Sequence, residues 1–415
     1  MNCRTSSRCR RISSCGSNSP IPASPTRNCL IDTPDPLVPE LVRLLPAFLA
    51  RQRWYAGAGT PQVEVRSVRP LATGSTSVVL VTVDASDAGG ERSATYFVPL
   101  GLRAERPRGL LDRYDLGELA TPQGRRHLYD ALAHPDTAVE LANAVFPDQR
   151  FATSALQAGE QSNTSVVFDE RTILKVFRQV HEGSNPDIEV TRALGSVGFT
   201  DVPVPIGVWA DGATDLGVLR TFEPSSGSGS SLALASLRQV LEQGRDPRVA
   251  RGDFAAASRE LGATIARLHV ALAAAFGAEP ADGPGWASDM AAQLSRVSAG
   301  RLDPVRIAVI YDRLAAAQDL GQAIRIHGDL HLEQVLRGKK RWLVLDFEGE
   351  PDRPMSERRR RSSPLRDVAG MTRSYQYAAS LALREHGAGR SSVGDQERLL
   401  AAAWAERNMN AFLTG

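Results

Sequence analysis

The residues best suited to chemistry lie in residues 326–350, which have the sequence IHGDLHLEQVLRGKKRWLVLDFEGE. Asp329 and Asp346 stand roughly 17 positions apart there, with Gln334 between them. Transfer of a phosphoryl group needs an acceptor hydroxyl aimed at the γ-phosphate and a cation that neutralises the phosphate charge. The pattern therefore predicts that Asp329 accepts the hydrogen bond of the acceptor hydroxyl, and that Asp346 and Gln334 offer oxygen atoms to Mg²⁺.

This spacing is typical of the protein-kinase-like fold, in which two adjacent β-turns carry the catalytic carboxylate and the metal ligands. The alternative is a reverse turn and a buried strand whose acids have no catalytic role. Because both halves of the motif occur together, joined by an apolar strand, we favour the catalytic interpretation. Glu348 is a further candidate metal ligand, with the capping of a turn as its alternative role. ATP with Mg²⁺ is the expected cofactor.

A lysine inside an apolar strand is the next candidate. Lys175 lies centrally in I-L-K-V-F, where it could place a cation over the α- and β-phosphates, held by Glu189 on the following helix. The alternative is an edge strand whose lysine reaches solvent. Upstream, G-E-Q-S-N-T-S-V stands where a glycine-rich loop would cover the phosphates. Ser162, Asn163 and Thr164 are therefore candidate nucleotide contacts, with a simple polar turn as the alternative.

Other residues near these motifs complete the expected site. Four are expected to contact the acceptor: His331, Glu333, Arg373 and Tyr375. Phe222 is expected to contact the nucleotide where the two lobes meet. His327 should brace the catalytic loop by hydrogen bonds, since Asp329 already supplies the base. Asp367 is most simply a helix cap, and the arginine run at residues 358–361 a solvated loop.

The composition argues against several classes of function. Hydrophobic residues make up 42% and charged residues 23% of the 415 residues, as in an ordinary soluble protein, and the net charge is +2. Bulk charge thus predicts neither nucleic acid nor membrane as a partner. All four cysteines lie in the first 29 residues without a C-x-x-C pair, so a zinc site is not expected. The cysteine-free remainder fits a cytoplasmic protein.

The chain divides into four expected regions. Residues 1–34, rich in Arg and Ser, are expected to be a disordered or non-native extension, with an organellar transit peptide as the alternative. Residues 35–150 should form a small α+β module that begins with a helix near Pro36. Its further expected elements are strands at residues 63–68, 77–83 and 94–100, and helices at residues 126–133 and 137–145.

The expected ATP-binding part spans residues 151–224, and residues 225–415 form a helical lobe with the catalytic loop. The ATP-binding part should contain a hairpin of strands at residues 165–168 and 173–177, followed by a helix capped by Ser184 or Asn185. Two further strands are expected at residues 204–209 and 216–222. The Gly/Ser-rich stretch at residues 223–231 is expected to be a flexible connector between the lobes.

Several motifs together resemble the bacterial maltokinases. These are H-G-D-L-H-L-x-Q, D-F-E-G-E-P, S-P-L-R-D-V-A-G-M and, near the start, R-Q-R-W-Y-A-G. Such aminoglycoside-phosphotransferase-like kinases convert maltose and ATP to maltose 1-phosphate. The resemblance implies an α+β, bilobal protein-kinase-like fold with an N-terminal cap subdomain and a helical C-terminal lobe. It implies a role in glycogen or α-glucan synthesis, with maltose as acceptor and trehalose synthase as a possible partner. By the same resemblance, Asp329 is the base, Gln334 and Asp346 bind metal, and Lys175 anchors phosphate.

Two alternatives to a maltokinase stay open. The first is another small-molecule kinase of this fold, such as an aminoglycoside kinase, which local charge disfavours. Residues 351–415 hold 11 Arg against 7 acidic residues, a balance of 11 − 7 = +4, where a polycationic acceptor would want the reverse. The second is a non-catalytic nucleotide-binding module that regulates trehalose synthase.

The last helix carries a broad stripe of apolar residues, and we expect it to lack a covering surface, as in a truncated lobe. Its apolar residues are Leu399, Leu400, Trp404, Met409, Phe412 and Leu413.

Overall fold

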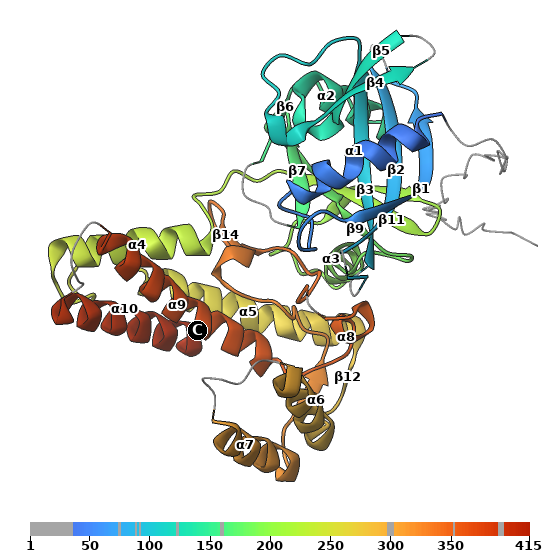
Figure 1. The fold of residues 1–415 in the computed structure, drawn as a ribbon. Helices are drawn as coiled ribbons and strands as arrows, with labels where there is room; N and C mark the ends of the chain where they lie inside the picture. Colours follow the sequence, from blue (N-terminus) through green and yellow to red (C-terminus); the bar gives the residue numbers. More distant parts are fainter. Residues whose placement is uncertain are drawn as a thin grey trace, which may run out of the picture.

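The computed structural model describes residues 36–73, 76–87, 89–90, 93–121, 124–157, 162–296, 303–351, 353–388 and 394–415. The expected extension at residues 1–34 and the first part of the expected phosphate loop, residues 159–161, lie outside the described residues. Three parts follow one another along the chain. Figure 1 shows two β-rich parts lying together, coloured blue to green, and below them a helical lobe, coloured yellow-green to red.

The first part, the cap, is a helix packed on an antiparallel sheet. Helix α1 (Val38–Ala50) buries Leu41, Leu45 and Phe48 against strands in the order β1-β2-β3-β5-β4. The strands are β1 (Gln62–Leu71), β2 (Ser77–Ser86), β3 (Ser93–Arg103), β4 (Asp115–Thr121) and β5 (Gly124–Asp130), followed by α2 (Pro135–Val145). The helix expected at residues 126–133 is wrong. Residues 126–130 belong to β5, because they hydrogen-bond to β3 and β4 on both sides, and this pairing overrides local helix preference. Residues 131–133 form one short 3₁₀ helix.

The second part holds a five-stranded sheet in the order β10-β11-β8-β7-β6. Its elements are β6 (Ser154–Leu156), β7 (Asn163–Phe168), β8 (Thr172–Phe177), α3 (Pro186–Ser196), β10 (Pro205–Asp211) and β11 (Thr214–Thr221). The predicted hairpin is confirmed as β7–β8, and of the two predicted caps Asn185 is the one that accepts from the N–H of Asp187, at 2.8 Å. A two-residue strand after β8, β9 (Gln179–Val180), adds to the cap sheet beside β3.

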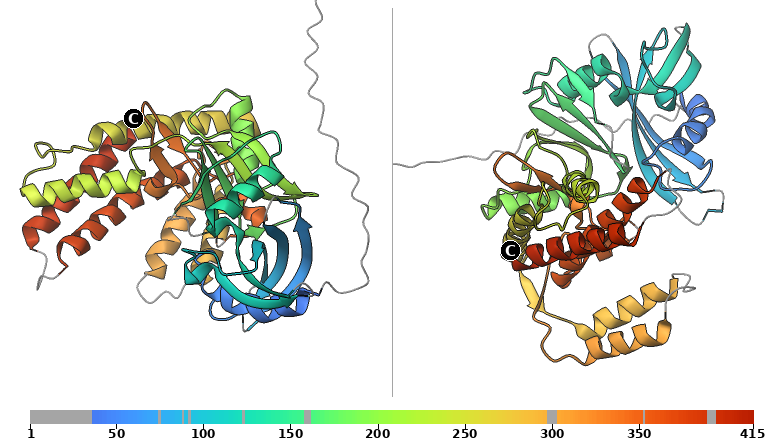
Figure 2. Two further views of the ribbon diagram at one scale, coloured as in Figure 1. Left: turned by 90° about the horizontal axis from the view of Figure 1, so that it is seen from above. Right: turned by 90° about the vertical axis from the view of Figure 1, so that its left-hand side faces the viewer.

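The helical lobe follows a connector that is shorter than expected. Helix α4 (Gly229–Gln243) begins inside the Gly/Ser stretch, because the Ser228 hydroxyl accepts from the N–H of Ser231 and caps it. The further helices are α5 (Ala255–Phe276), α6 (Gly283–Arg296), α7 (Pro304–Ala316), α8 (Met355–Arg358), α9 (Leu365–His386) and α10 (Asp395–Thr414). The short strands are β12 (Ala278–Pro280), β13 (Gln322–Ile324), β14 (Val335–Arg337) and β15 (Trp342–Val344). Figure 2 shows α6 and α7 as a hairpin that stands away from the other helices.

The expectation that the last helix lacks a covering surface is wrong. Trp404 and Phe412 of α10 are buried in the core that α4, α5 and α9 form, and the Trp404 Nε1 donates to Ser236 Oγ at 3.0 Å. Of the six apolar residues that the sequence analysis assigned to the stripe on this helix, only Leu399 and Leu413 are strongly exposed. The apolar stripe is therefore covered by the chain's own helices. Among the described residues, no helix combines the length and the apolar character needed to cross a bilayer.

Candidate active site

The catalytic loop lies between β13 and β14 and is held by its own histidine, as predicted. His327 donates from Nε2 to the carbonyl oxygen of Leu345 at 2.7 Å, and its ring lies 4.8 Å from that of Phe347. The next residue, Gly328, has φ +87°, a conformation that L-residues with side chains rarely adopt. Asp329 follows directly from this turn, and its side chain is 35% exposed. Burial raises the pKa of the Asp329 carboxyl, and although the nearby histidines oppose the shift, the charges of other cleft carboxylates add to it.

Asp367 supports this loop and is not a helix cap. Helix α9 begins at Leu365, so Asp367 lies in its first turn with a fully buried carboxylate. That carboxylate accepts from the backbone N–H groups of His327 and Gly328, both at 2.9 Å, and from His269 Nε2 at 3.0 Å. Burial favours the neutral form, but the hydrogen bond from His269 and the charge of His327 outweigh it and lower the pKa. Asp367 therefore fixes the backbone on which Asp329 stands.

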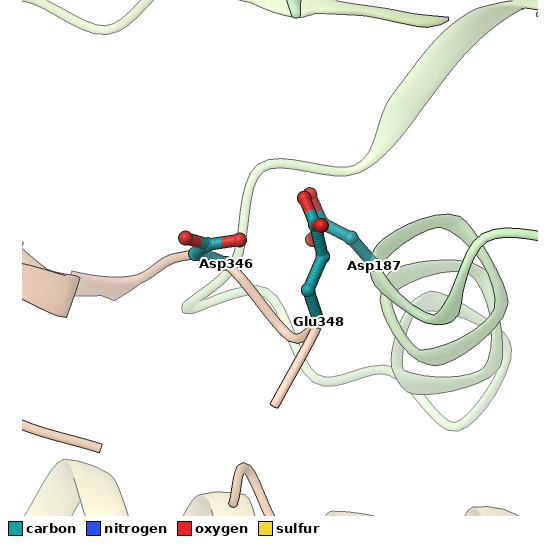
Figure 3. Close-up of side chains that lie close together, drawn as sticks. All are labelled: Asp187, Asp346 and Glu348. Carbon is teal, nitrogen blue, oxygen red and sulfur yellow. The ribbon is translucent and has the colours of Figure 1, made fainter. Parts of the chain in front are cut away.

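Lys175 is surrounded by three carboxylates from two different parts of the chain. Its Nζ lies 3.1 Å from Asp187 Oδ2, 2.7 Å from Asp346 Oδ1 and 2.8 Å from Glu348 Oε1. Figure 3 shows these carboxylates converging, Asp187 from α3 and the other two from the turn after β15. The cluster joins the five-stranded sheet, which carries Lys175, to the helical lobe, which carries Asp346 and Glu348. Lys175 is thus neither at an edge nor pointing to solvent.

The predicted partner of Lys175, Glu189, is wrong; Asp187 takes that place. Glu189 instead lies 3.3 Å from Arg359. The reason is helical phase, since two residues along a helix turn the side chain by about 200° and aim it away from the cleft. The arginine run is also not a simple solvated loop, because three of its members pair with acids on neighbouring elements. These pairs are Arg359–Glu189, Arg360–Asp289 and Arg361–Glu279.

Asp187 is the buried centre of this ion-pair network. Its Oδ2 also lies 3.1 Å from Arg220 Nη1, and its Oδ1 accepts from the N–H of Phe347 at 3.3 Å. Burial alone would raise its pKa, but the charges of Arg220 and Lys175 outweigh this and lower it well below the ordinary range. Asp187 is therefore ionised and already satisfied by protein donors. It positions Lys175 and ties α3 to the D-F-E turn.

The residues expected to hold a cation lie close to one another. Asp346 has φ +62°, in the left-handed region that aspartate tolerates better than most residues, and its Oδ2 accepts from Gln334 Nε2 at 3.4 Å. One oxygen each of Asp187, Asp346 and Glu348 lies within 4.8 Å of the others. Asp187 is fully buried and paired with both Arg220 and Lys175, whereas the side chains of Asp346 and Glu348 are 27% and 20% exposed. Asp346 and Glu348, with Gln334, are therefore the residues that would hold Mg²⁺. Burial raises the pKa of Glu348. A nearby cation would act in the opposite direction and favour the ionised form.

The candidate nucleotide contacts before and within β7 point to different sides. Asn163 Nδ2 donates to Glu348 Oε1 at 2.7 Å, so this side chain faces the cleft, and exposed Ser162 precedes it. Thr164 was predicted to contact the nucleotide, but its side chain points to the opposite face of the strand. Its hydroxyl accepts from Arg178 Nε at 2.8 Å, because successive side chains of a strand alternate between its faces. Phe222 follows β11, half-buried at the connector where it was expected, and its N–H donates to the carbonyl oxygen of Arg171 at 2.7 Å.

The expected acceptor contacts are only partly brought together. His331 Nε2 lies 3.9 Å from Asp329 Oδ2, and Glu333 is exposed on the same loop. Arg373 is exposed on α9. Tyr375 cannot contact a substrate in this structure, because it is fully buried between the rings of Phe254, Trp404 and Phe412. The helical periodicity of α9 turns Tyr375 into the core.

Comparisons with known proteins agree with this geometry. Residues 48–133 match the sequence profile of the maltokinase N-terminal cap domain, and residues 155–350 match that of the phosphotransferase enzyme family. The chain therefore joins a segment similar to the maltokinase cap to a longer segment similar to the phosphotransferase enzyme family. The expected kinase-like fold with an N-terminal cap is confirmed.

Curated relatives of the chain include two glucosamine kinases. The one from Streptacidiphilus jiangxiensis is 31% identical over 280 residues, which are 60% of this chain and 61% of that protein. The one from Mycolicibacterium smegmatis is 29% identical over 254 residues, 58% of this chain and 63% of that protein. The chain thus matches less than two thirds of the length of these relatives. A solved glucosamine kinase in complex with glucosamine, ADP and inorganic phosphate is 24% identical, with a TM-score of 0.56, over 92% of this chain and 86% of that one.

Three residues of the candidate site were not predicted from the sequence. Arg220 neutralises Asp187, Asp367 holds the catalytic loop, and Glu350 lies near Asp329, whose pKa its charge helps to raise. Glu350 itself pairs with Arg353 at 2.5 Å and with Arg366 at 2.8 Å. Arg220 and Asp367 could have been noticed in the sequence, since each is a charged residue inside an apolar pattern. The partner that explains each charge, however, is far away in the chain.

Proposed function

We propose that this phosphotransferase is an ATP-dependent kinase that acts on a hydroxyl group of a sugar. The observation that carries the proposal is the placement of Lys175 between Asp187, Asp346 and Glu348, next to the loop that presents Asp329. A non-catalytic nucleotide-binding module would have no need for an intact base on a braced loop. The arrangement instead supplies charge for the phosphates on one side and a base for the acceptor on the other.

The reaction assigns one task to each group. The acceptor oxygen forms a bond to the γ-phosphorus as the bond from that phosphorus to the β,γ-bridging oxygen breaks, and the hydroxyl proton passes to Asp329. Lys175, held by Asp187, binds the nucleotide phosphates. Mg²⁺, held by Asp346, Glu348 and Gln334, would supply neutralisation of the phosphate charge when bound. Asp329 needs no nucleophilic role, because positioning and charge stabilisation account for most of this catalysis.

For the acceptor we infer a glucose-type sugar, with glucosamine as the first candidate. Two curated relatives named glucosamine kinase support it, since their alignments cover more than half of this chain. Maltose is the second candidate, and the match of residues 48–133 to the maltokinase cap favours it. A link to trehalose synthase and a role in α-glucan synthesis, both implied by the family resemblance, stay predictions.

A comparison of acceptors tests the proposal. ADP release by the purified chain is followed with Mg–ATP and, separately, glucosamine, maltose and kanamycin, with a reaction lacking acceptor as the control. We expect ADP release that depends on glucosamine or maltose, and the ratio of the two kcat/KM values assigns the acceptor. Rapid phosphorylation of kanamycin without phosphorylation of either sugar would contradict the sugar-kinase assignment. ATP binding without any turnover would favour the regulatory module.

A further inference from the structure

A buried arginine joins the cap to the nucleotide-binding sheet. Arg178 lies between β8 and β9, and its side chain is 1% exposed. Its Nη2 donates to Asp130 Oδ2 at 2.5 Å, and its Nε donates to Thr164 Oγ1 at 2.8 Å. Asp130 is the last residue of β5 in the cap, and Thr164 is the second residue of β7. One guanidinium therefore bonds to both parts.

The cap holds this arginine on several sides. The second carboxylate oxygen of Asp130 accepts from the N–H of Leu132 at 3.0 Å, so its orientation is fixed. The guanidinium of Arg178 lies 4.9 Å over the ring of Trp54, and the Arg178 carbonyl oxygen accepts from the N–H of Phe97 at 2.8 Å. Because the ion pair is fully buried, water cannot replace either partner at low cost.

The other side of Arg178 leads to the phosphate-binding charges. Thr164 is followed back along β7 by Asn163, whose Nδ2 donates to Glu348 Oε1 at 2.7 Å. Glu348 in turn lies 2.8 Å from Lys175 Nζ. Since neighbouring side chains of a strand point to opposite faces, fixing Thr164 on the cap side also fixes Asn163 on the cleft side. A continuous series of contacts thus runs from the cap to the nucleotide site.

We propose that the cap positions the nucleotide site through Asp130, Arg178 and Thr164. These three residues act as positioning residues that hold the start of β7, so that Asn163 meets Glu348. The proposal rests on the proposed function, because it concerns the binding of Mg–nucleotide at the same site. The competing interpretation is an appended cap with no influence on the cleft, in which case breaking this connection leaves nucleotide binding unchanged.

A pair of substitutions at one position tests the connection. Thr164→Val has nearly the same shape but lacks the oxygen that accepts from Arg178, whereas Thr164→Ser keeps it. We expect Thr164→Val to raise the KM for Mg–ATP and the Kd for Mg–ADP about threefold to tenfold, the scale of one hydrogen bond, without changing the acceptor KM. Thr164→Ser should restore both values to near wild type. An unchanged Kd in Thr164→Val would overturn the proposal.

Cap substitutions extend the test across the interface. Asp130→Asn should weaken Mg–ADP binding in the same direction as Thr164→Val. Asp84→Asn is the matched control, because Asp84 is also a cap aspartate paired with an arginine, Arg66, and its contacts with Arg66 and Thr95 stay within the cap. Equal effects of Asp130→Asn and Asp84→Asn would mean general loosening of the cap and would contradict a specific connection.

Hydrogen exchange gives a readout that a purely structural role would not change. If cap and nucleotide are coupled, the coupling is reciprocal, so Mg–ADP should slow exchange of the β5 amides at residues 128–130. The slowing should be lost in Thr164→Val, even if Asp130→Asn fails to fold. If the exchange rate of the β5 amides in the wild type is the same with and without Mg–ADP, the proposal is overturned. Calorimetry and exchange with Mg–ADP need no turnover, so a chain that phosphorylates no sugar would contradict the proposed function without deciding this one.

Discussion

The two ends of the proposed kinase site are built on different principles. At the nucleotide end, the side chains of Lys175, Asp187 and Arg220 are 10%, 0% and 6% exposed and pair with one another. At the acceptor end, Asp329 and His331 are each 35% exposed and lie 3.9 Å apart. A buried ion pair that loses one partner leaves an uncompensated charge, whereas an exposed group is resolvated. In the proposed kinase, the nucleotide end would therefore combine stability with binding, while the acceptor end would serve chemistry and be free to change specificity.

The largest expected effect falls on rate alone, at the acceptor end. Asp329→Asn should lower kcat by about 10²–10⁴-fold, because it removes the group that accepts the hydroxyl proton. The free energy of unfolding and the Kd for Mg–ADP should stay close to wild type, since Asp329 is itself 35% exposed and its nearest charged partner, His331, is equally exposed. Pre-steady-state measurement of phosphoryl transfer, with calorimetry for ADP, checks both halves. A variant with more than about a tenth of wild-type turnover would remove Asp329 from this role.

Asp187 should couple stability to binding at the other end. Asp187→Ala leaves Arg220 buried without its counter-charge and removes one of the three carboxylates around Lys175. We therefore expect a loss of about 3–5 kcal/mol in the free energy of unfolding together with nucleotide binding. Glu189→Gln is the matched control on the same helix, because the Glu189–Arg359 pair is partly exposed and should contribute about 0–1 kcal/mol. Denaturant unfolding measures both variants. Equal losses in the two would break the distinction between buried and exposed pairs.

The identity of the cation at the nucleotide end offers a sharper test. The chain has 49 Lys and Arg, of which only residues 175, 339 and 340 are lysine, so 49 − 3 = 46 are arginine. A point charge that meets three carboxylates suits an ammonium better than a planar guanidinium. Lys175→Arg should weaken Mg–ATP affinity about tenfold to hundredfold, the scale of charge-assisted hydrogen bonds. Exposed Lys340→Arg should change nothing; comparable losses from both would argue against a specific fit.

The smallest expected effect concerns acid stability. The pKa of Asp367 is lowered from its ordinary value of 3.8, so its ionised form stabilises the folded chain above that value, and this contribution is lost as pH falls through the lower folded pKa. Asp367→Asn should cost about 1–3 kcal/mol near neutral pH, the range for buried hydrogen bonds. Denaturant unfolding of both chains as a function of pH should show this difference shrinking as the solution becomes strongly acidic. A difference that is constant with pH would mean that ionisation of Asp367 plays no part.

The sequence was informative where chemistry and local pattern coincide. The loop with Asp329, the turn with Asp346 and the strand with Lys175 could be predicted, because each combines a charged residue with an apolar flank that only a site explains. The hairpin β7–β8 and the strands β10 and β11 followed from alternation and turn residues. These features depend on neighbours within a few residues.

The errors have a shared cause in long-range packing. Asp187 and Glu189 lie in the same helical turn, and only the orientation of α3 against the D-F-E turn decides which one meets Lys175. The strand β5 depends on pairing with β3 across more than 20 residues, and Tyr375 is buried because α10 covers α9. Composition and periodicity contain none of these relations. Arg178 escaped prediction for the same reason, since its two partners come from different parts of the fold.

The most direct test of the account follows the phosphorus atom itself. Phosphorus NMR of the chain with Mg–ATP and glucosamine, and separately maltose, distinguishes ATP, ADP, inorganic phosphate and a sugar phosphate monoester. The account predicts a monoester signal that grows in step with ADP, requires Mg²⁺, and is absent over the same time with Asp329→Asn. Release of inorganic phosphate without any monoester, or an equal monoester signal from Asp329→Asn, would contradict it.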